Sequence, residues 1–337
     1  MSYDLYVEKP QGDIPTQLRL LVTEPNSANA AKQFVQFVHG KASGFNVFID
    51  QKYKHLESLG LLLTPPDMAL VPLGSWFLQF TFTLAKPWMS KDDDPFYVTE
   101  SVNPVRKDKV FKVPTISAAT WKGLLRWTVM HTRLRLQNDQ LAEQFAQERL
   151  DQTLLFGDEK GEEPGVTKDF AAYLDKLGGK EARKLYVQKV RELFHLDEKA
   201  EMPQHSGRLM FYPTFFNLID VEVINPHSRK TKAGTHPIYL ECVPQDVSGT
   251  FSLLYVPFDL IGKSEAEAKK QALEDLKLVA EGLQAMFLTY GFSAKRTSGY
   301  GVAKDEIVGG GVVKTRADEK KFTRLSQMAQ EVKDVRF

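Results

Sequence analysis

The stretch WFLQFTFTL, residues 76–84, decides the fold class because apolar side chains occupy every second position. Gln79, Thr81 and Thr83 lie between them. A period of two residues is typical of a β-strand that buries one face and leaves the other more polar. We therefore expect a half-buried strand that ends near Lys86.

A basic helix is expected after this strand, over ATWKGLLRWTVMHTRLRLQ, residues 119–137. Ser117 is a residue type that caps helix N-termini. At helical spacing, the residues expected on the buried face are Trp121, Leu125, Thr128 and Leu136. The cations expected on other faces are Lys122, Arg126, Arg133 and Arg135.

The segment between strand and helix, residues 86–115, is polar and contains prolines. Connections of this length are uncommon, and many are functional. Its run Asp92, Asp93 and Asp94 offers carboxylates for a hydrated divalent cation or for orienting a ribose 2′-hydroxyl. A solvated turn is the more ordinary role for such a run, so both interpretations stay open.

The second half of the chain continues with strands and one long helix. Strands are expected over residues 208–224, 236–244 and 249–262, and the first two are joined by the basic tip NPHSRKTKAGT. A capping box of Ser264 and Glu267 begins the helix, which ends before Gly291. A glycine-rich loop and a final short strand follow it.

This order of strand, helix, strands, helix and strand indicates a ferredoxin-like α+β unit with insertions. We place that domain at residues 75–312. Residues 1–74 are predicted to be an extension of short strands or hairpins, and the charged, helix-prone residues 158–204 a solvent-exposed insertion. Residues 313–337 are predicted to be a charged tail.

Composition limits the classes of function. The 337 residues carry 44 Lys+Arg and 43 Asp+Glu, a net charge of +1, so any site for a polyanion must be a local patch. A lone Cys242 excludes an internal disulfide and a multi-thiolate zinc site, and the 7 histidines show no metal-ligand spacing. No apolar run reaches the roughly 20 residues of a membrane span, and the opening segment does not resemble a signal peptide. We expect a cytoplasmic protein with no membrane contact, resident metal or cofactor.

Three separate basic sites suggest a groove for RNA. In the glycine-rich segment, Lys295 and Arg296 precede Ser298, Gly299, Tyr300 and Gly301, where glycines let backbone N–H groups approach phosphates. The second site, in the tip, holds the cations Arg229, Lys230 and Lys232 beside His227 and His236. The third is the pair Lys122 and Arg126, one helical turn apart.

Each basic site also has an ordinary structural interpretation. A glycine-rich segment can be a bulged turn, and a basic tip can be a solvated hairpin end. The aromatic residues available for base stacking are Phe96, Tyr97, Phe111 and Tyr300. An aromatic residue in a strand more often belongs to the core.

Four segments together resemble the RAMP superfamily of CRISPR-associated proteins. They are VNPVRKDKVFKVPTISAATWKGLLR (102–126), LLFGD (154–158), HSGRLMFYP (205–213) and FSAKRTSGYGVAKD (292–305). IYLECVP and GTFSL, within residues 238–253, also look like the family's pattern. The resemblance covers about residues 75–312 and is closest to the crRNA-binding backbone subunits of type III effector complexes.

The resemblance implies a ferredoxin-like, RRM-like core that grips crRNA through Lys122, Arg126 and the loop 295–301. The tip, residues 226–236 of a thumb spanning 225–237, would wedge between guide and target. Implied partners are crRNA, target RNA and the other RAMP and large subunits of the complex.

Cleavage by this chain is in doubt because Val102 stands where active family members have an aspartate. The helix motif also departs from the family's pattern, since Ser-Ala-Ala-Thr, residues 117–120, replaces its usual Gly-Ser-Ser.

Enzymatic activity is therefore left open. One alternative is a Mg²⁺-dependent target-RNA endonuclease that uses Asp92, Asp93 or Asp94. Another is a stand-alone crRNA-processing endoribonuclease with His131 or His227 as general base. A scaffold without RNA contact is the remaining one.

Overall fold

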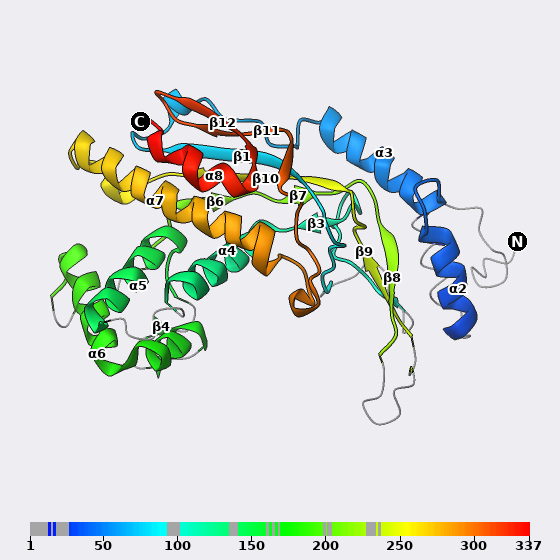
Figure 1. Cartoon of the computed structure of the whole chain (residues 1–337), viewed down its shortest axis with the longest axis horizontal. Helices are drawn as coiled ribbons and strands as arrows, with labels where there is room; N and C mark the ends of the chain where they lie inside the picture. The colour runs from blue at the N-terminus through cyan, green and yellow to red at the C-terminus, as the bar shows by residue number, and fades with distance from the viewer. Residues whose placement is uncertain are drawn as a thin grey trace, which may run out of the picture.

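The computed structural model describes residues 13–14, 16–17, 27–92, 102–134, 141–159, 162–163, 166–167, 169–197, 200, 204–226, 234 and 237–337. Its centre is a five-stranded antiparallel sheet of order β12-β11-β1-β10-β6 (Figure 1). Its strands are β1 (Trp76–Thr83), β6 (Leu209–Phe211), β10 (Ser248–Tyr255), β11 (Glu306–Lys314) and β12 (Glu319–Arg324).

The predicted strand at residues 76–84 is confirmed as β1, at the middle of this sheet. Its buried face packs against two helices, α4 (Ala118–Arg133) and α7 (Glu265–Ala285). Phe82 lies edge-on to Trp121, with ring centroids 6.1 Å apart, and Phe80 lies edge-on to Phe287 at 5.1 Å. Of the three strands expected between the two helices, the first and third supply β6 and β10 of the central sheet, whereas the second contains β9 (Ile238–Cys242), which belongs to another sheet. Along the chain, β1, α4, β6, β10, α7 and β11 follow one another in the expected order of strand, helix, strands, helix and strand.

Helix α7 begins and ends where the sequence predicts. Ser264 and Glu267 form the capping box, and a π-helical turn (Met286–Tyr290) continues the helix to Gly291. Gly291 has a φ of +75°, which a glycine adopts without strain.

The predicted strand at residues 208–224 is wrong as a single element. It is divided into β6, β7 (Thr214–Phe215) and β8 (Asp220–Ile224). Pro213, which has no N–H to donate to a ladder, lies at the first break. β7 pairs with β3 (Thr115–Ile116), whereas β8 joins a second sheet.

The second sheet contains the arms of the predicted hairpin. Its order is β2-β9-β8, with β2 (Val102–Asn103) parallel to β9 (Ile238–Cys242) and β8 antiparallel to it. Figure 1 shows β8 and β9 projecting together from the body of the protein.

The prediction of short strands within residues 1–74 is wrong, because this segment contains α2 (Ser27–Val38) and α3 (Gly44–Ser58). Phe45, Ile49 and Leu56 recur at helical spacing and are buried in the same core as β1. Ser43 caps α3 through a hydrogen bond from the backbone N–H of Asn46. Short apolar runs cannot distinguish a buried helix face from a strand. A 3₁₀ turn (Met68–Leu70) precedes β1.

The region predicted as an exposed insertion is helical, and one side of its helix is buried. It holds β4 (Glu162–Glu163), β5 (Val166–Thr167) and α6 (Asp169–Leu193), and α6 packs on α5 (Ala142–Phe156). Ala182, Tyr186 and Val190 are buried there. The many charges of α6 mask its apolar side in a composition count, which is why the prediction of solvent exposure is wrong.

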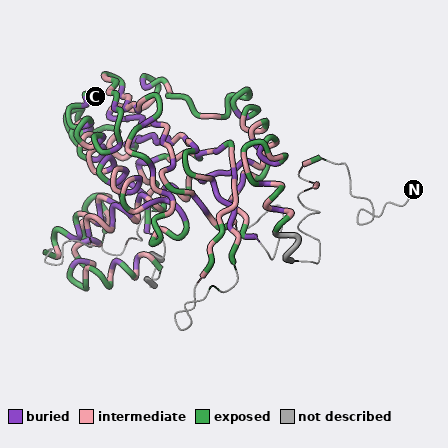
Figure 2. Tube along the Cα trace, turned by 45° about the vertical axis from the view of Figure 1, so that its right-hand side comes forward, coloured by how far each residue is buried: buried purple, intermediate pink, exposed green. Residues whose placement is uncertain are grey.

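The predicted C-terminal tail is also wrong. Residues 319–324 form β12 at one edge of the central sheet, and α8 (Leu325–Glu331) follows. Phe322, Leu325 and Met328 are buried in the main core. Figure 2 shows the buried residues gathered in the interior of the protein. Within the described residues, no helix is long and apolar enough to cross a membrane.

Candidate RNA interface

The N-terminal turn of α4 fixes the orientation of its basic residues. The side chain of Ser117 accepts a hydrogen bond from the backbone N–H of Thr120 at 3.2 Å, which confirms the predicted cap. The indole N–H of the buried Trp121 donates to Thr214 Oγ1 at 3.0 Å. Lys122, the next residue, is half-buried and has no ion-pair partner among the described residues. Burial and the neighbouring charge of Arg126 lower the pKa of Lys122.

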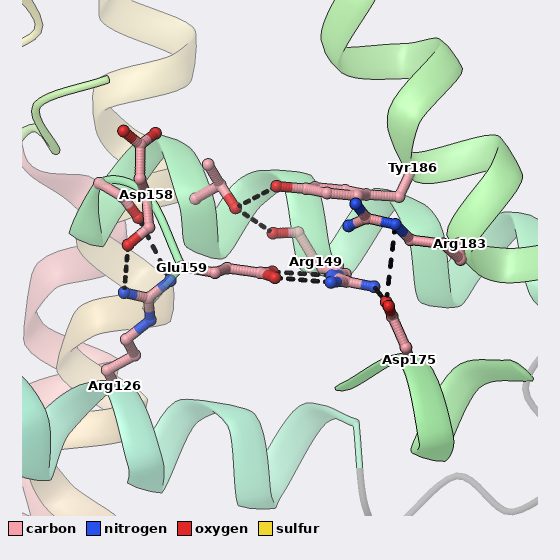
Figure 3. A network of polar contacts seen from close by, with 9 residues as sticks. Arg126, Arg149, Asp158, Glu159, Asp175, Arg183 and Tyr186 are labelled. Carbon is pink, nitrogen blue, oxygen red and sulfur yellow. Dashed lines mark hydrogen bonds and ion pairs between the residues drawn. The ribbon is translucent and has the colours of Figure 1, made fainter. Parts of the chain in front are cut away.

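Arg126 lies one turn further along α4, and its guanidinium makes contacts inside the protein (Figure 3). It donates to the backbone carbonyls of Asp158 at 3.0 Å and Gly157 at 3.2 Å. The same group lies over the ring of Phe170, 4.9 Å from its centroid. Arg126 therefore links α4 to the LLFGD segment, and the expected contact with crRNA stays a prediction.

A buried ionic network holds the helices beside Arg126 in place (Figure 3). Arg149 of α5 makes a bidentate pair with Glu159, with N–O distances of 2.7 and 2.5 Å, and donates to Asp175 at 2.7 Å. Its guanidinium also lies 4.3 Å from the ring centroid of Tyr186 on α6. Since Glu159 directly follows Asp158, this network also positions the carbonyl groups that bind Arg126.

Two of the family-like segments cross at their glycines. The backbone N–H of Asp158 donates to His205 O at 3.2 Å, and that of Arg208 to Leu154 O at 3.0 Å. A Cβ atom on Gly207 would lie 2.4 Å from the backbone nitrogen of Gly157. Only glycine allows this approach, so the two motifs build one structural junction.

Arg208 of the HSGRL segment is a core residue. It donates to Asp259 at 2.9 Å and to Asp275 at 2.7 Å, and the hydroxyl of Tyr255 donates to the same Asp275 oxygen at 2.7 Å. The sequence gives no sign that this arginine is buried.

The glycine-rich loop contacts α4. Lys295 is exposed and adopts a left-handed conformation, with a φ of +58°. Ser298 and Gly299 are exposed beside it. The guanidinium of Arg296 lies 4.3 Å from the ring centroid of Trp127, which directly follows Arg126. Trp127 was not among the predicted site residues, although its i, i+4 spacing from His131 is visible in the sequence. The two rings stack with their centroids 4.6 Å apart.

The same loop contacts the base of the hairpin. The hydroxyl of Tyr300 donates to Glu222 of β8 at 3.0 Å, and the ring packs beside Met89 and Cys242. A Cβ atom on Gly301 would lie 2.2 Å from Ser293 Cβ, so only glycine fits. Burial raises the pKa of the Cys242 thiol, in agreement with a packed rather than a reactive residue.

The acidic run is described only at Asp92, because Asp93 and Asp94 lie outside the described residues. Asp92 lines a pocket of about 470 Å³ together with Arg106, Lys109 and the first residues of α4. Among the described residues, no group of three or more His, Cys, Asp or Glu side chains is placed to hold a metal ion. Val102 is 2% exposed, in β2.

A buried ion pair fixes the segment that leads from β2 to α4. Lys107 pairs with Glu241 of β9, and Glu241 also accepts a hydrogen bond from the backbone N–H of Val105 at 2.9 Å. Phe111 is partly buried and lies edge-on to His55, so packing occupies this ring. Predicted residues that lie outside the described part are Phe96, Tyr97, His227, Arg229, Lys230, Lys232 and His236.

The fold is thus an α+β domain in which α4, the glycine-rich loop and the base of the hairpin adjoin. A model of the RAMP superfamily matches residues 97–304, more than half of the chain. The chain therefore belongs to the RAMP superfamily of CRISPR-associated proteins.

Comparison with solved structures finds proteins of low sequence identity to this chain. No curated protein matches the chain. A chain of the type III-B Cmr-beta complex bound to cognate target RNA is 13% identical, with 88% of this chain and 73% of that chain covered and a TM-score of 0.36. Cmr6 from Pyrococcus furiosus is 15% identical, with 68% and 99% covered and a TM-score of 0.31. A chain of a CRISPR RNA-guided surveillance complex is 12% identical, with 71% and 68% covered and a TM-score of 0.40.

Proposed function

We propose that this protein is a crRNA-binding subunit of a type III CRISPR effector ribonucleoprotein, which holds guide RNA and shapes its pairing with target RNA. The observation that carries the proposal is that the glycine-rich loop joins two other motif-bearing elements. Arg296 lies against Trp127 of α4, and Tyr300 is bonded to Glu222 at the hairpin base. One strand of RNA passing over the loop would meet all three elements.

The topology supports a ferredoxin-like, RRM-like core. Within the central sheet, the four strands that alternate with α4 and α7 have the order β11-β1-β10-β6, the antiparallel arrangement of that fold. β12 extends it by one strand. The hairpin of β8 and β9 is then the thumb, and its neighbours in the complex would be other RAMP and large subunits.

Because the net charge is only +1, RNA must be bound by a local group of cations. Lys122 and Lys295 have no ion-pair partner within the described part of the chain, and Arg296 is stacked rather than paired. Arg126 is a poor test residue, because its substitution would also remove its bonds to residues 157 and 158.

The experiment is to purify the complex through this chain, measure its absorbance ratio at 260 and 280 nm, and sequence the RNA. Alanine at Lys122, Lys295 and Arg296 together should lower RNA retention. It should also reduce the salt slope of RNA binding by about 2, since each contact to single strands contributes about 0.7. Alanine at the lysines 320, 321 and 333, on and after β12, is the matched control. Equal retention and equal slopes in the two folded variants would refute this RNA site.

One observation favours a second candidate, a metal-dependent target-RNA endonuclease: Asp92 shares a pocket with the cation of Arg106. We nevertheless propose that the subunit does not cut RNA, because the buried Val102 stands where active family members have an aspartate. A valine binds no divalent ion and accepts no proton. Asparagine at residues 92–94 should leave every target-cleavage product of the assembled complex in place. Loss of one specific product, with assembly intact, would establish the nuclease.

A further inference from the structure

The face of β1 and β10 that points away from α4 and α7 is lined by polar side chains. Three cross-strand pairs lie in register along it, with side-chain hydrogen bonds of 2.9 to 3.0 Å within each pair: Gln79 with Ser252, Thr81 with Thr250, and Thr83 with Ser248. This row of hydroxyl and amide groups is the floor of a groove.

Helix α3 and the residues after it form one wall of this groove. A pocket of about 760 Å³ lies between α3 and the polar floor. Tyr53, Thr81 and Thr250 line both this pocket and a neighbouring one of about 260 Å³, so the two adjoin. Gln79 also donates to the backbone carbonyl of Leu63 at 2.9 Å, which fixes the wall to the floor.

The row of pockets continues to the N-terminus of α4. Pro213 and Phe215 line both the second pocket and the pocket of about 470 Å³ that holds Arg106. The sheet face is therefore followed by three adjoining hollows, and the first two are walled in part by the segment predicted to be an extension of unclear role.

The chemistry of this groove suits a short single-stranded RNA. The rings of Tyr53 and Phe215 line it and offer surfaces for base stacking, and the hydroxyl floor offers partners for ribose and phosphate oxygens. Lys41 lines the first pocket and Arg106 the third, and neither has an ion-pair partner in the described part of the chain. Carboxylates line both end pockets as well, and in the first pocket Asp50 and Asp246 are paired with Lys54 and Lys304. Lys41 and Arg106 are thus the cations left to face a phosphate backbone, which an uncharged polypeptide strand would not need.

We propose that the groove between α3 and the β1–β10 face binds a single-stranded RNA segment, as a site separate from the α4 and glycine-loop interface. The proposal rests on the proposed function in that the protein must carry RNA. The sheet face lies opposite α4, whereas the third hollow reaches Ser117 and Ala118 at the N-terminus of that helix. The two sites use different cations, so their contributions can be measured with separate variants.

The test uses the full chain and a fluorescein-labelled octauridylate, with binding followed by anisotropy at 50 to 300 mM salt. Glutamate at both Lys41 and Arg106 should weaken binding at least tenfold and lower the salt slope by about 1 to 2. Glutamate at Lys321 and Lys333, exposed residues on and after β12, is the matched control and should bind like the wild type. If the double variant Lys41→Glu, Arg106→Glu has a lower thermal unfolding midpoint than the wild type, the double variant Lys41→Met, Arg106→Met is measured in its place.

Photocrosslinking locates the bound strand. An oligonucleotide with 4-thiouridine should crosslink to peptides that contain Tyr53 or Phe215, including when Lys122, Lys295 and Arg296 are alanine. If the variants at Lys41 and Arg106 bind RNA with unchanged affinity, the groove is not an RNA site, and the proposed function still stands. The same conclusion follows if only the variant with alanine at Lys122, Lys295 and Arg296 loses RNA. Gln51 lines the first pocket, and Gln51→benzoylphenylalanine introduces a photocrosslinker there. Capture of a protein instead of RNA by this variant in the assembled complex would also overturn the proposal.

Discussion

Replacing Asp151 by asparagine should stabilise the protein, by an amount that grows with pH. Asp151 is on α5, and burial, with smaller contributions from Glu148 and Asp275, raises its carboxyl pKa from 3.8 to about 6. Gln147 donates to one of its oxygens at 3.0 Å, a bond that asparagine keeps. Since the folded state holds the proton more tightly, the native state loses stability as pH rises through the window from 3.8 to about 6.

The size of the effect follows from the same shift. The linkage relation gives a penalty of about 1.6 kcal/mol at pH 5 and about 3 kcal/mol at pH 7.5 for the wild type, which asparagine does not incur. Urea denaturation at the two pH values should therefore show the advantage of Asp151→Asn increasing by about 1.4 kcal/mol. The exposed Asp334→Asn controls for the removal of a negative charge. An advantage that is absent, or equal at both pH values, would mean that α5 does not bury this carboxyl against the core.

Three further outcomes are expected. Glu159→Gln should lower the free energy of unfolding by about 3 kcal/mol, because Arg149 keeps its charge in a buried site; an unchanged denaturation midpoint would contradict the network. Gly207→Ala should cost on the order of 2 kcal/mol or more, whereas Gly123→Ala, in open space on α4, should be neutral or slightly stabilising in the same thermal melts. Removing residues 315–337 should give insoluble protein, and a soluble, cooperatively unfolding truncation would show that β12 and α8 are dispensable.

The elements with strong local signals were predictable from the sequence. The alternation in residues 76–84 gave β1, and the capping box at Ser264 with the stop at Gly291 gave α7. These signals are local, since each depends on residues within a few turns or one strand. The prediction for the N-terminal segment failed because its short apolar runs fit a buried helix face as well as a strand. The prediction for the C-terminal segment failed because its buried residues acquire meaning only through the core that they join.

The candidate site shows the same division. The glycines at positions 157, 207 and 301 were visible as parts of sequence motifs. The sequence did not show that each of them allows a close backbone approach. Arg126 was expected to contact RNA on the strength of its charge. Its carbonyl partners lie 31 and 32 residues away in the chain, so no local pattern could reveal that it faces inward.

The bond between Tyr300 and Glu222 makes the hairpin and the glycine-rich loop mechanically dependent on each other. A hydrogen bond to a carboxylate contributes about 1.5 to 3 kcal/mol, or roughly a ten- to hundredfold bias between the joined and separated arrangements. If the loop and the hairpin both contact RNA, as proposed above, a strand that displaces the tyrosine hydroxyl would free the hairpin to reorient. A hairpin bound in a duplex would in turn change the position of the loop.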